Sequence, residues 1–326
     1  MESNRKVYMN GSFINESEAK ISIYDSALMF GDMVFEMTRS FNGEQFKLKE
    51  HIDRLFDGLK ILRIDIPLSK IELEDICYQT VEINRPFFAT SDEHRLIIDV
   101  SRGLLGIYQS VSGLHKGPNI IVADFPLRWT VSSMGKLFDS GINAVITSQR
   151  AIPASLMDPK IKNRSRLFYL MANIEVSQYS GENNWALMLD TDGFISEGTG
   201  DNFFMIKNGV IYTPEGRNIL RGISRNYIID EIAPSLGIKV VEKNIEAYDV
   251  YTADEAFLTG TPFCMLPVTS LNSVAIGDGK VGKLFEKMLS QWSSNVGVDI
   301  KSQIKGWAGG DTPSGPTPYQ FKTKKS

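Results

Sequence analysis

A carboxylate, Glu197, lies among small residues in the segment 195–203, with strand-forming residues on both sides. Glycine and other small residues let a ligand approach the backbone closely. The same pattern is typical of a polar loop between two strands. Taken alone, this segment favours the loop.

A second segment, 219–225, places Gly222 and Ser224 at the predicted start of a helix. The free N–H groups of a helix start, together with the helix dipole, favour an anion such as phosphate. Ser224 suits an ordinary N-cap equally well. Both interpretations stay open at this point.

Alternating basic residues precede another predicted helix, and they are Lys160, Lys162, Arg164 and Arg166. Such a run is usually a solvated basic face. Lys162, however, stands where a strand-to-helix connection can direct its amine into a cleft. A desolvated lysine with a lowered pKa is what Schiff-base chemistry needs.

The three segments together match the protein groups that pyridoxal phosphate requires. A lysine forms the imine, a carboxylate pairs with the pyridinium nitrogen, and a helix start holds the phosphate. The combination therefore predicts a phosphate-bearing carbonyl cofactor.

The elements that position these residues can be predicted from turn residues and hydrophobic spacing. Asn10-Gly11 and Asn42-Gly43 predict two hairpins, because both central residues of such turns need φ > 0. Spacing predicts helices at 52–62, 69–83, 166–179, 224–236 and 280–292, and strands at 96–98, 119–122, 144–146, 185–189, 203–206 and 256–258. Hairpins outnumber strand–helix–strand units, which argues against a doubly wound parallel sheet. The fold class expected is α/β, and within that class the α+β type, in which hairpins and helices are mixed.

Composition excludes several classes of protein. Hydrophobic residues make up 42% of the 326 residues, enough for a sizeable core, and the net charge of -4 argues against binding nucleic acid. Two cysteines, Cys77 and Cys264, are too few for a disulfide framework or a thiolate zinc site. The three histidines lack metal-ligand spacing, so no metal is expected. Without a targeting or membrane-spanning segment, the expected location is the cytoplasm.

The chain resembles the class IV (fold type IV) pyridoxal-phosphate aminotransferases. This family includes branched-chain and D-amino-acid aminotransferases, (R)-amine transaminases and aminodeoxychorismate lyase. The resemblance runs from about Tyr8 to Val268 in the family's order. Its motifs are FGDMVFE at 30–36, HIDRL at 51–55, SRG at 101–103, IKN at 161–163, ISEG at 195–198 with Asn202-Phe203, LRGISR at 220–225, and TGTP at 259–262 with Pro267-Val268.

The resemblance implies that Lys162 is the catalytic Schiff-base lysine, with Lys160 as the alternative. Glu197 is implied to pair with the protonated pyridine nitrogen, which keeps the ring an electron sink. The other cofactor-binding residues implied are Arg54, Ile223, Ser224 and Thr261 toward the phosphate, Leu220 on a ring face, and Asn202 as support for Glu197.

Substrate residues follow the family less closely. The candidates are Phe30, Phe35, Arg39, Arg102, Arg166 and Pro262. Arg39, Arg102 and Arg166 are hypothesised to hold the substrate carboxylate, because an arginine fork matches a carboxylate. Phe30 and Leu167 stand where branched-chain enzymes have tyrosine, and Ile97 replaces the tyrosine of D-amino-acid enzymes.

The resemblance also implies an architecture and a reaction. The expected parts are an N-terminal α/β domain at 1–126, a linker at 127–135, a C-terminal pseudo-barrel domain at 136–302, and a mobile tail at 303–326. The cofactor is expected between the domains of a homodimer. The reaction expected is ping-pong transfer of an amino group from an amino acid or amine to a 2-oxo acid, of branched-chain-aminotransferase type. A D-amino-acid or (R)-amine transaminase, an aminodeoxychorismate-type lyase and a non-catalytic cofactor-binding protein are the alternatives.

Overall fold

The computed structural model describes residues 4–181 and 183–308, and the chain divides into two units. The N-terminal unit runs to Leu127 and also includes Ile161–Arg166, whereas the C-terminal unit comprises Arg128–Lys160 and the described chain from Leu167 onward. The first crossing between units therefore falls within the predicted linker. Of the predicted tail, residues 303–306 end a helix, and residues 309–326 lie outside the described residues.

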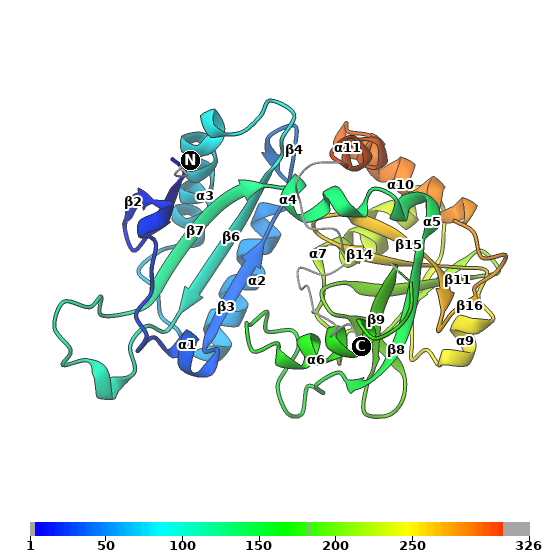
Figure 1. The fold of residues 1–326 in the computed structure, drawn as a ribbon, viewed down its shortest axis with the longest axis horizontal. Helices are drawn as coiled ribbons and strands as arrows, with labels where there is room; N and C mark the ends of the chain where they lie inside the picture. Colours follow the sequence, from blue (N-terminus) through cyan, green and yellow to red (C-terminus); the bar gives the residue numbers. More distant parts are fainter. Residues whose placement is uncertain (1–3, 182, 309–326) are drawn as a thin grey trace, which may run out of the picture. The chain divides into compact units, whose positions relative to one another are not determined.

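The N-terminal unit is built on a five-stranded antiparallel sheet (Figure 1). Its strand order is β2-β1-β7-β6-β3. The strands are β1 (Lys6–Met9), β2 (Ser12–Asn15), β3 (Met33–Met37), β6 (His94–Ser101) and β7 (Asn119–Pro126). The Asn10-Gly11 hairpin is confirmed, since β1 pairs with β2 and both turn residues have positive φ.

Two helices, α2 (Leu48–Leu62) and α3 (Lys70–Asn84), cover one face of this sheet (Figure 1). Their apolar residues recur at helical spacing, and Ser69 begins α3 as the N-cap of a capping box. They pack on Leu96, Ile98 and Val100 of β6, each of which is fully buried. Alternate residues of β6 therefore lie on the other face of the sheet.

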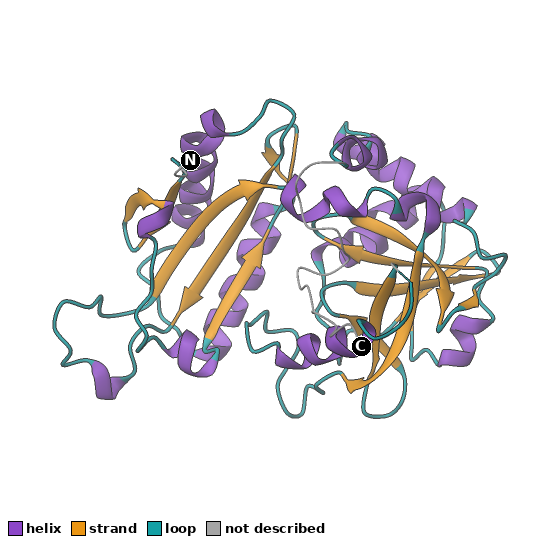
Figure 2. Cartoon of the chain, viewed as in Figure 1, coloured by secondary structure: helices purple, strands orange, loops and turns teal. Residues whose placement is uncertain are grey.

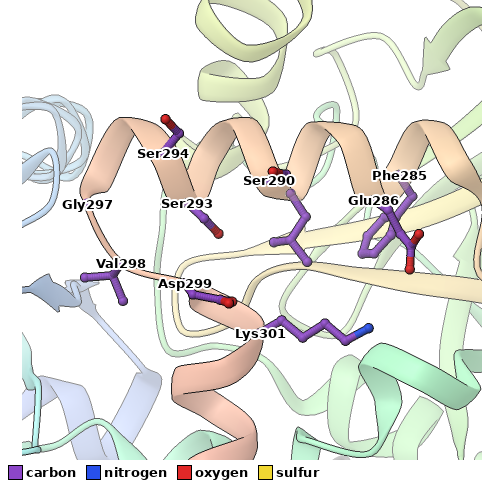
Figure 3. A pocket seen from close by; sticks show the side chains of 10 residues that line it. Phe285, Glu286, Ser290, Ser293, Ser294, Gly297, Val298, Asp299 and Lys301 are labelled. Carbon is purple, nitrogen blue, oxygen red and sulfur yellow. The ribbon is translucent and has the colours of Figure 1, made fainter.

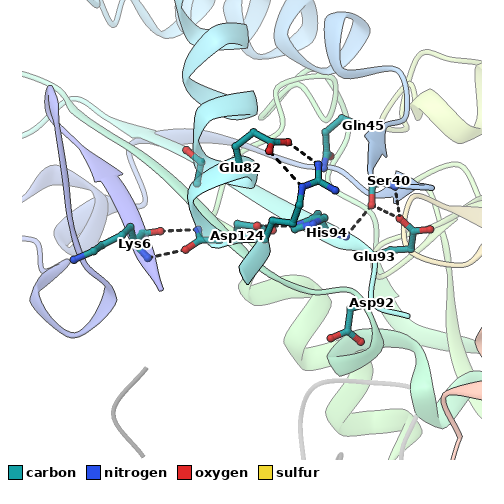
Figure 4. Close-up of polar contacts among 12 residues, drawn as sticks. Lys6, Ser40, Gln45, Glu82, Asp92, Glu93, His94 and Asp124 are labelled. Carbon is teal, nitrogen blue, oxygen red and sulfur yellow. Dashed lines mark hydrogen bonds and ion pairs between the residues drawn. The ribbon is translucent and has the colours of Figure 1, made fainter. Parts of the chain in front are cut away.

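Short elements complete this unit. They are α1 (Ser26–Phe30), β4 (Ser40–Phe41), β5 (Glu44–Gln45) and the 3₁₀ turns η1 (Glu16–Glu18), η2 (Arg85–Phe87) and η3 (Gly106–Tyr108). The Asn42-Gly43 turn does join two strands, β4 and β5. Glu93 secures this hairpin, because its carboxylate accepts hydrogen bonds from the Ser40 hydroxyl and the N–H groups of Asn42 and Gly43 (Figure 4).

The C-terminal unit contains a closed barrel of strands (Figure 2). The path β10-β9-β8-β15-β14-β11 closes on itself because β10 also pairs with β11, and β12, β13 and β16 extend it. The strands are β8 (Ile142–Arg150), β9 (Asn184–Leu189), β10 (Ile195–Gly198), β11 (Asn202–Lys207), β12 (Val210–Thr213), β13 (Val240–Glu242), β14 (Glu255–Gly260), β15 (Cys264–Leu271) and β16 (Val274–Ala275).

Helices surround these strands (Figure 1). They are α4 (Arg128–Val131), η4 (Ser132–Met134), α5 (Leu137–Ser140), α6 (Leu167–Val176), α7 (Ile223–Tyr227), the π-helix η5 (Ile228–Ile232), α8 (Ala233–Ser235), α9 (Ala247–Tyr251), α10 (Lys283–Val296) and α11 (Ile300–Gly306). α11 follows the helix that the sequence predicted as the last one. In the described part of the chain, no helix has the length and apolar character needed to cross a membrane.

Candidate active site

Lys162 lies in the segment Ile161–Arg166, which runs beside the edge strand β3 of the N-terminal sheet. The N–H of Phe35 donates to the Lys162 carbonyl at 2.9 Å, and Asn163 forms a bridge with Val34. Residues opposite each other in an antiparallel pair project from the same face. Accordingly, Nζ of Lys162 is 4.9 Å from the centre of the Phe35 ring.

The amine of Lys162 makes no hydrogen bond and no ion pair with the described residues. Burial, followed by the charges of Arg166, Arg54 and Arg164, lowers the pKa of Lys162 well below its ordinary value, against the opposing effect of Glu36. A lowered pKa makes the amine easier to deprotonate, and the neutral amine is the nucleophile that attacks a carbonyl.

Arg54, predicted to bind a phosphate, is held by Glu36. Nε and Nη2 of Arg54 donate to the two carboxylate oxygens of Glu36 at 2.6 and 2.8 Å, and Nδ1 of His51 lies 2.7 Å from Oε2. Burial favours the neutral acid, but Arg54 and His51 together hold the pKa of Glu36 below its ordinary value. The pair fixes the guanidinium of Arg54 within electrostatic reach of Lys162.

Two of the residues predicted for the substrate lie with Lys162. Phe35 is buried beneath its amine, and the guanidinium carbon of Arg166 is 4.9 Å from the Phe35 ring centre. The guanidinium carbon of Arg164, a residue of the same basic run, lies closer still, at 3.7 Å from the centre of the Phe35 ring. Phe30 ends α1 and is 68% exposed.

The remaining predicted arginines are engaged elsewhere in the N-terminal unit. Arg39 is buried, stacks on Phe41, and donates from Nε to the carbonyl of Ser40. Arg102 donates from Nε to Asp32 at 2.6 Å and also caps two backbone carbonyls at the end of α2. Lys160, the alternative lysine, belongs to the C-terminal unit and pairs with an aspartate at 2.8 Å.

Glu197 is the centre of a hydrogen-bonded cluster in the C-terminal unit. It is 4% exposed and lies on β10 opposite Asn202 of β11. Oε1 accepts from the Tyr169 hydroxyl at 2.7 Å, while Oε2 accepts from the Leu220 N–H at 3.0 Å and from Nδ2 of Asn202 at 3.3 Å. Three donors therefore stabilise the ionised form of Glu197 and fix its position.

Tyr169 was missed by sequence reasoning. It lies on α6, a helix whose other residues are mostly apolar, and its ring is buried. A buried tyrosine hydroxyl needs a polar partner. That requirement was a signal available in the sequence, although it did not identify Glu197 as the partner.

Asn202 connects Glu197 to the loop that begins α7. Its Nδ2 also donates to the Leu220 carbonyl at 2.9 Å. Gly222 follows closely, and a Cβ atom there would collide with Oδ1 of Asn202, so only glycine fits without a shift. Asn202 therefore holds Glu197 and the Leu220 carbonyl together, and its role toward the cofactor stays a prediction.

Ile223 and Ser224 open α7, which continues through η5 and α8 to residue 235. Gly222 is the N-cap and supplies no side-chain acceptor. The first N–H groups of a helix have no acceptor within the helix, so they suit an anion. Both residues lie at a helix start, and their binding of a phosphate stays a prediction.

Thr261 and Pro262 lie in the turn between β14 and β15. The register pairs Thr259 of β14 with Asn202 of β11, so this turn follows directly from the Glu197 cluster. Oγ1 of Thr259 is buried and makes no hydrogen bond to any described residue. A buried hydroxyl without a partner is a donor available to a ligand.

Asp201 is a further acidic group that the sequence did not single out. It is buried beside Glu197, and its Oδ1 makes no hydrogen bond within the described residues. Burial, with the negative charge of Glu197, raises the pKa of Asp201 to about 8. Glu197 therefore lies beside a carboxyl that is largely protonated at neutral pH.

A pocket of about 510 Å³ lies elsewhere in the C-terminal unit, between α10 and the start of α11 (Figure 3). Phe285, Leu289 and Ser293 of α10 line it together with Asp299 and Lys301. None of the residues predicted for the active site lines this pocket. It therefore plays no part in the site described here.

Each unit holds groups of a kind that pyridoxal phosphate requires. The N-terminal unit supplies an amine with no hydrogen-bond partner among the described residues and an ordered guanidinium, whereas the C-terminal unit supplies a buried carboxylate, a helix start and the Thr259 hydroxyl. When bound, this cofactor supplies an aldehyde and a ring that accepts electrons.

The chain belongs to the class IV aminotransferases, because the model of the family "Amino-transferase class IV" matches residues 33–271. A putative branched-chain-amino-acid aminotransferase of Methanocaldococcus jannaschii is 39% identical over 285 residues, which cover 87% of this chain and 93% of that protein. The branched-chain-amino-acid aminotransferase of Escherichia coli K12 is 30% identical over 288 residues, covering 86% and 90%.

Solved structures of branched-chain aminotransferases share the fold. The branched-chain aminotransferase from the archaeon Thermoproteus uzoniensis, solved with norvaline, superposes with a TM-score of 0.76 at 28% identity, covering 94% of this chain and 97% of that one. The Escherichia coli enzyme gives a TM-score of 0.79 at 26% identity, covering 95% and 97%. A further branched-chain enzyme, complexed with N-(5'-phosphopyridoxyl)-L-glutamate, gives a TM-score of 0.77 at 28% identity, covering 94% and 98%.

The family and fold predicted from the sequence are therefore confirmed. The protein is a transaminase of class IV, a family whose members use pyridoxal phosphate. The type of aminotransferase predicted, one like the branched-chain enzymes, is confirmed as well.

Proposed function

We propose that this protein transfers the amino group of a branched-chain amino acid to a 2-oxo acid by a ping-pong mechanism. The relatives at 30–39% identity carry that activity in their names, and each is matched over at least 86% of this chain. The observation that carries the proposal is the amine of Lys162, which has no hydrogen-bond partner in the described chain and a pKa that is lowered by burial and neighbouring cations.

Lys162 is the cofactor-anchoring lysine in this proposal, and it moves the proton at the substrate Cα. Glu197 holds the protonated ring nitrogen, with Tyr169 and Asn202 fixing its carboxylate. Leu220 packs on one face of the ring. These roles are supported by the available amine of Lys162 and by the three donors that keep Glu197 ionised.

The phosphate is assigned to Arg54, the N–H groups of Ile223 and Ser224, and Thr261. Glu36 restrains Arg54 with two hydrogen bonds, so the guanidinium is presented without loss of side-chain freedom on binding. The start of α7 contributes free N–H groups and the positive end of the helix dipole. Phe30, Phe35 and Pro262 are assigned to the substrate side chain.

A homodimer in the cytoplasm is part of the proposal. Large apolar side chains of the N-terminal unit are exposed in and before α1, and they are Ile21, Ile23, Leu28 and Met29. Contiguous exposed apolar residues are typical of a subunit interface. Both cysteines are buried thiols outside any disulfide of the described chain, as a reducing compartment allows.

Spectroscopy and a substrate panel test the function. The purified protein is loaded with pyridoxal phosphate and offered L-amino acids, D-amino acids and (R)-amines, with pyruvate and 2-oxoglutarate as acceptors. We expect a coloured protein and the fastest turnover with L-leucine, L-isoleucine or L-valine.

Three results would contradict the proposal. A protein that stays colourless with pyridoxal phosphate has no such site. Preferred turnover of D-amino acids or (R)-amines would assign it to another member of the family. Release of pyruvate from aminodeoxychorismate without an amino acceptor would identify a lyase, so that reaction is run in parallel.

A further inference from the structure

The face of the N-terminal sheet opposite α2 and α3 carries a row of polar and apolar side chains near Lys162. On β6 this face is formed by Arg95, Ile97 and Asp99, which alternate with the core residues of the strand. Asp99 lies opposite Phe35 of β3, and Ile97 lies opposite Met37. Residues 95 to 99 therefore extend along the sheet from the position of Phe35, over about 13 Å.

Arg95 is a buried cation without a counter-ion among the described residues. It is 7% exposed, and its Nε and Nη1 make no hydrogen bond to any of them. Its Nη2 approaches Sδ of Met37 on β3 at 3.7 Å, and its guanidinium carbon lies 5.7 Å from the centre of the Phe125 ring. Burial, with the charges of Arg164 and Arg39, lowers the pKa of Arg95 to about 9, which still leaves it protonated at neutral pH.

Arg164 is held on the same face. Its Nη2 donates to Oδ1 of Asp99 at 3.0 Å, and its guanidinium carbon lies 3.7 Å from the Phe35 ring centre. Asp99 is thus already engaged, and it orients Arg164 beside the ring that also carries Lys162. Arg95 and Arg164 are close enough for each charge to be felt by the other.

Two arginines beside the apolar side chains of this sheet face predict an anionic ligand that also has a hydrocarbon part. Burying a guanidinium whose N–H groups are unsatisfied is costly, and a carboxylate relieves that cost through charge-assisted hydrogen bonds. Ile97 and Met37 between the two arginines suit the carbon chain of such a ligand. An organic acid matches this surface better than inorganic phosphate does.

We propose that Arg95, together with Arg164, binds a carboxylate of the amino acid or 2-oxo acid substrate. This inference rests on the proposed function, and it names a specificity-determining residue outside Arg39, Arg102 and Arg166. The carboxylate can be the one beside the reacting carbon or a second one at the far end of a dicarboxylic acid. The experiment separates these two sources.

Binding of an unreactive acid to the pyridoxal-phosphate-loaded protein is the first measurement. 4-Methylvalerate has a carboxylate but no amino or oxo group, so titration calorimetry reports binding without turnover. If Arg95 holds a distal carboxylate, R95M should bind 4-methylvalerate as the wild type does. If Arg95 holds the carboxylate beside the reacting carbon, R95M should weaken this binding by about ten- to a hundredfold, the range for a lost hydrogen bond to a charged group. R164M should weaken it as well. R85M, which changes an arginine 50% exposed on the surface, is the matched control and should bind as the wild type does.

Steady-state kinetics identify the carboxylate. If Arg95 holds the one beside the reacting carbon, R95M raises KM for 4-methyl-2-oxovalerate and for 2-oxoglutarate alike. If it holds the distal one, only KM for 2-oxoglutarate rises. R95K retains the charge without the fork, so it should recover part of the lost affinity.

The melting temperature separates binding from a structural role. Replacing an unpaired buried charge with an apolar side chain should leave R95M at least as stable as the wild type. R95Q serves if R95M does not fold. Unchanged binding of 4-methylvalerate and unchanged KM values in a folded variant would overturn the inference. A wild-type protein that takes up no pyridoxal phosphate would instead refute the proposed function.

Discussion

Replacing Asp201 with asparagine should change how the stability of the C-terminal unit depends on pH. Asp201 is buried beside Glu197, and its pKa is raised from 3.8 to about 8 by burial and by that neighbouring charge. Between these values the unfolded chain has lost the proton, while the folded chain retains it. The free energy of unfolding therefore falls as the pH rises through this window.

The magnitude follows from proton linkage. One proton retained only by the folded state costs about 1.4 kcal/mol per pH unit. D201N removes this proton from both states. From about pH 5.5 to about pH 7.5, the stability of D201N relative to the wild type should rise by about 2–3 kcal/mol.

Urea unfolding followed by tryptophan fluorescence measures this difference. All four tryptophans, Trp129, Trp185, Trp292 and Trp307, belong to the C-terminal unit, so their signal reports on the unit that contains Asp201. D192N, a change in an exposed turn, is the control and should follow the wild type at both pH values. A stability difference between D201N and the wild type that is independent of pH would refute the reasoning.

Three further predictions concern the contacts of the site. E36Q should lower the free energy of unfolding by about 3–5 kcal/mol, because the partly buried guanidinium of Arg54 loses its counter-charge. E50Q in a surface pair should cost less than about 1 kcal/mol, and thermal unfolding followed by circular dichroism measures both. Y169F should weaken binding of pyridoxal phosphate by about 1.5–3 kcal/mol, because the hydrogen bond to Glu197 is lost. Y179F is the control and should bind the cofactor as the wild type does. A spectroscopic cofactor titration that gives the same affinity for both variants would contradict this prediction. G222A should lower the free energy of unfolding by about 1–3 kcal/mol, since its Cβ would collide with the amide oxygen of Asn202. An unchanged midpoint of urea unfolding would contradict this, because it would mean that the loop can shift without cost.

Local signals in the sequence predicted local structure well. Ser69 and the apolar spacing after it predicted α3, because an N-cap and a buried stripe act within one helix. The Asn42-Gly43 turn was placed correctly, but the strands it joins are only two residues each. β3 instead pairs with β6, some 60 residues further along the chain, and hydrophobic spacing does not reveal such a partner.

Non-local pairing explains what the sequence left unresolved in the site. Lys162 and Glu197 were identified from their motifs, yet nothing in the spacing showed that Ile161–Arg166 would pair with the edge of the N-terminal sheet. Arg95 was passed over as one residue of a strand. A charged residue that alternates with the buried residues of a strand indicates a candidate binding residue. That two N–H groups of Arg95 lack a hydrogen-bond partner among the described residues, however, is visible only in the three-dimensional structure.

Chemical trapping of the cofactor tests the central claim most directly. The protein loaded with pyridoxal phosphate is reduced with borohydride, digested, and mapped by peptide mass. We expect a pyridoxyl group on Lys162 in the wild type and no labelled peptide in K162A. A label on Lys160, or labelling that persists in K162A, would contradict it.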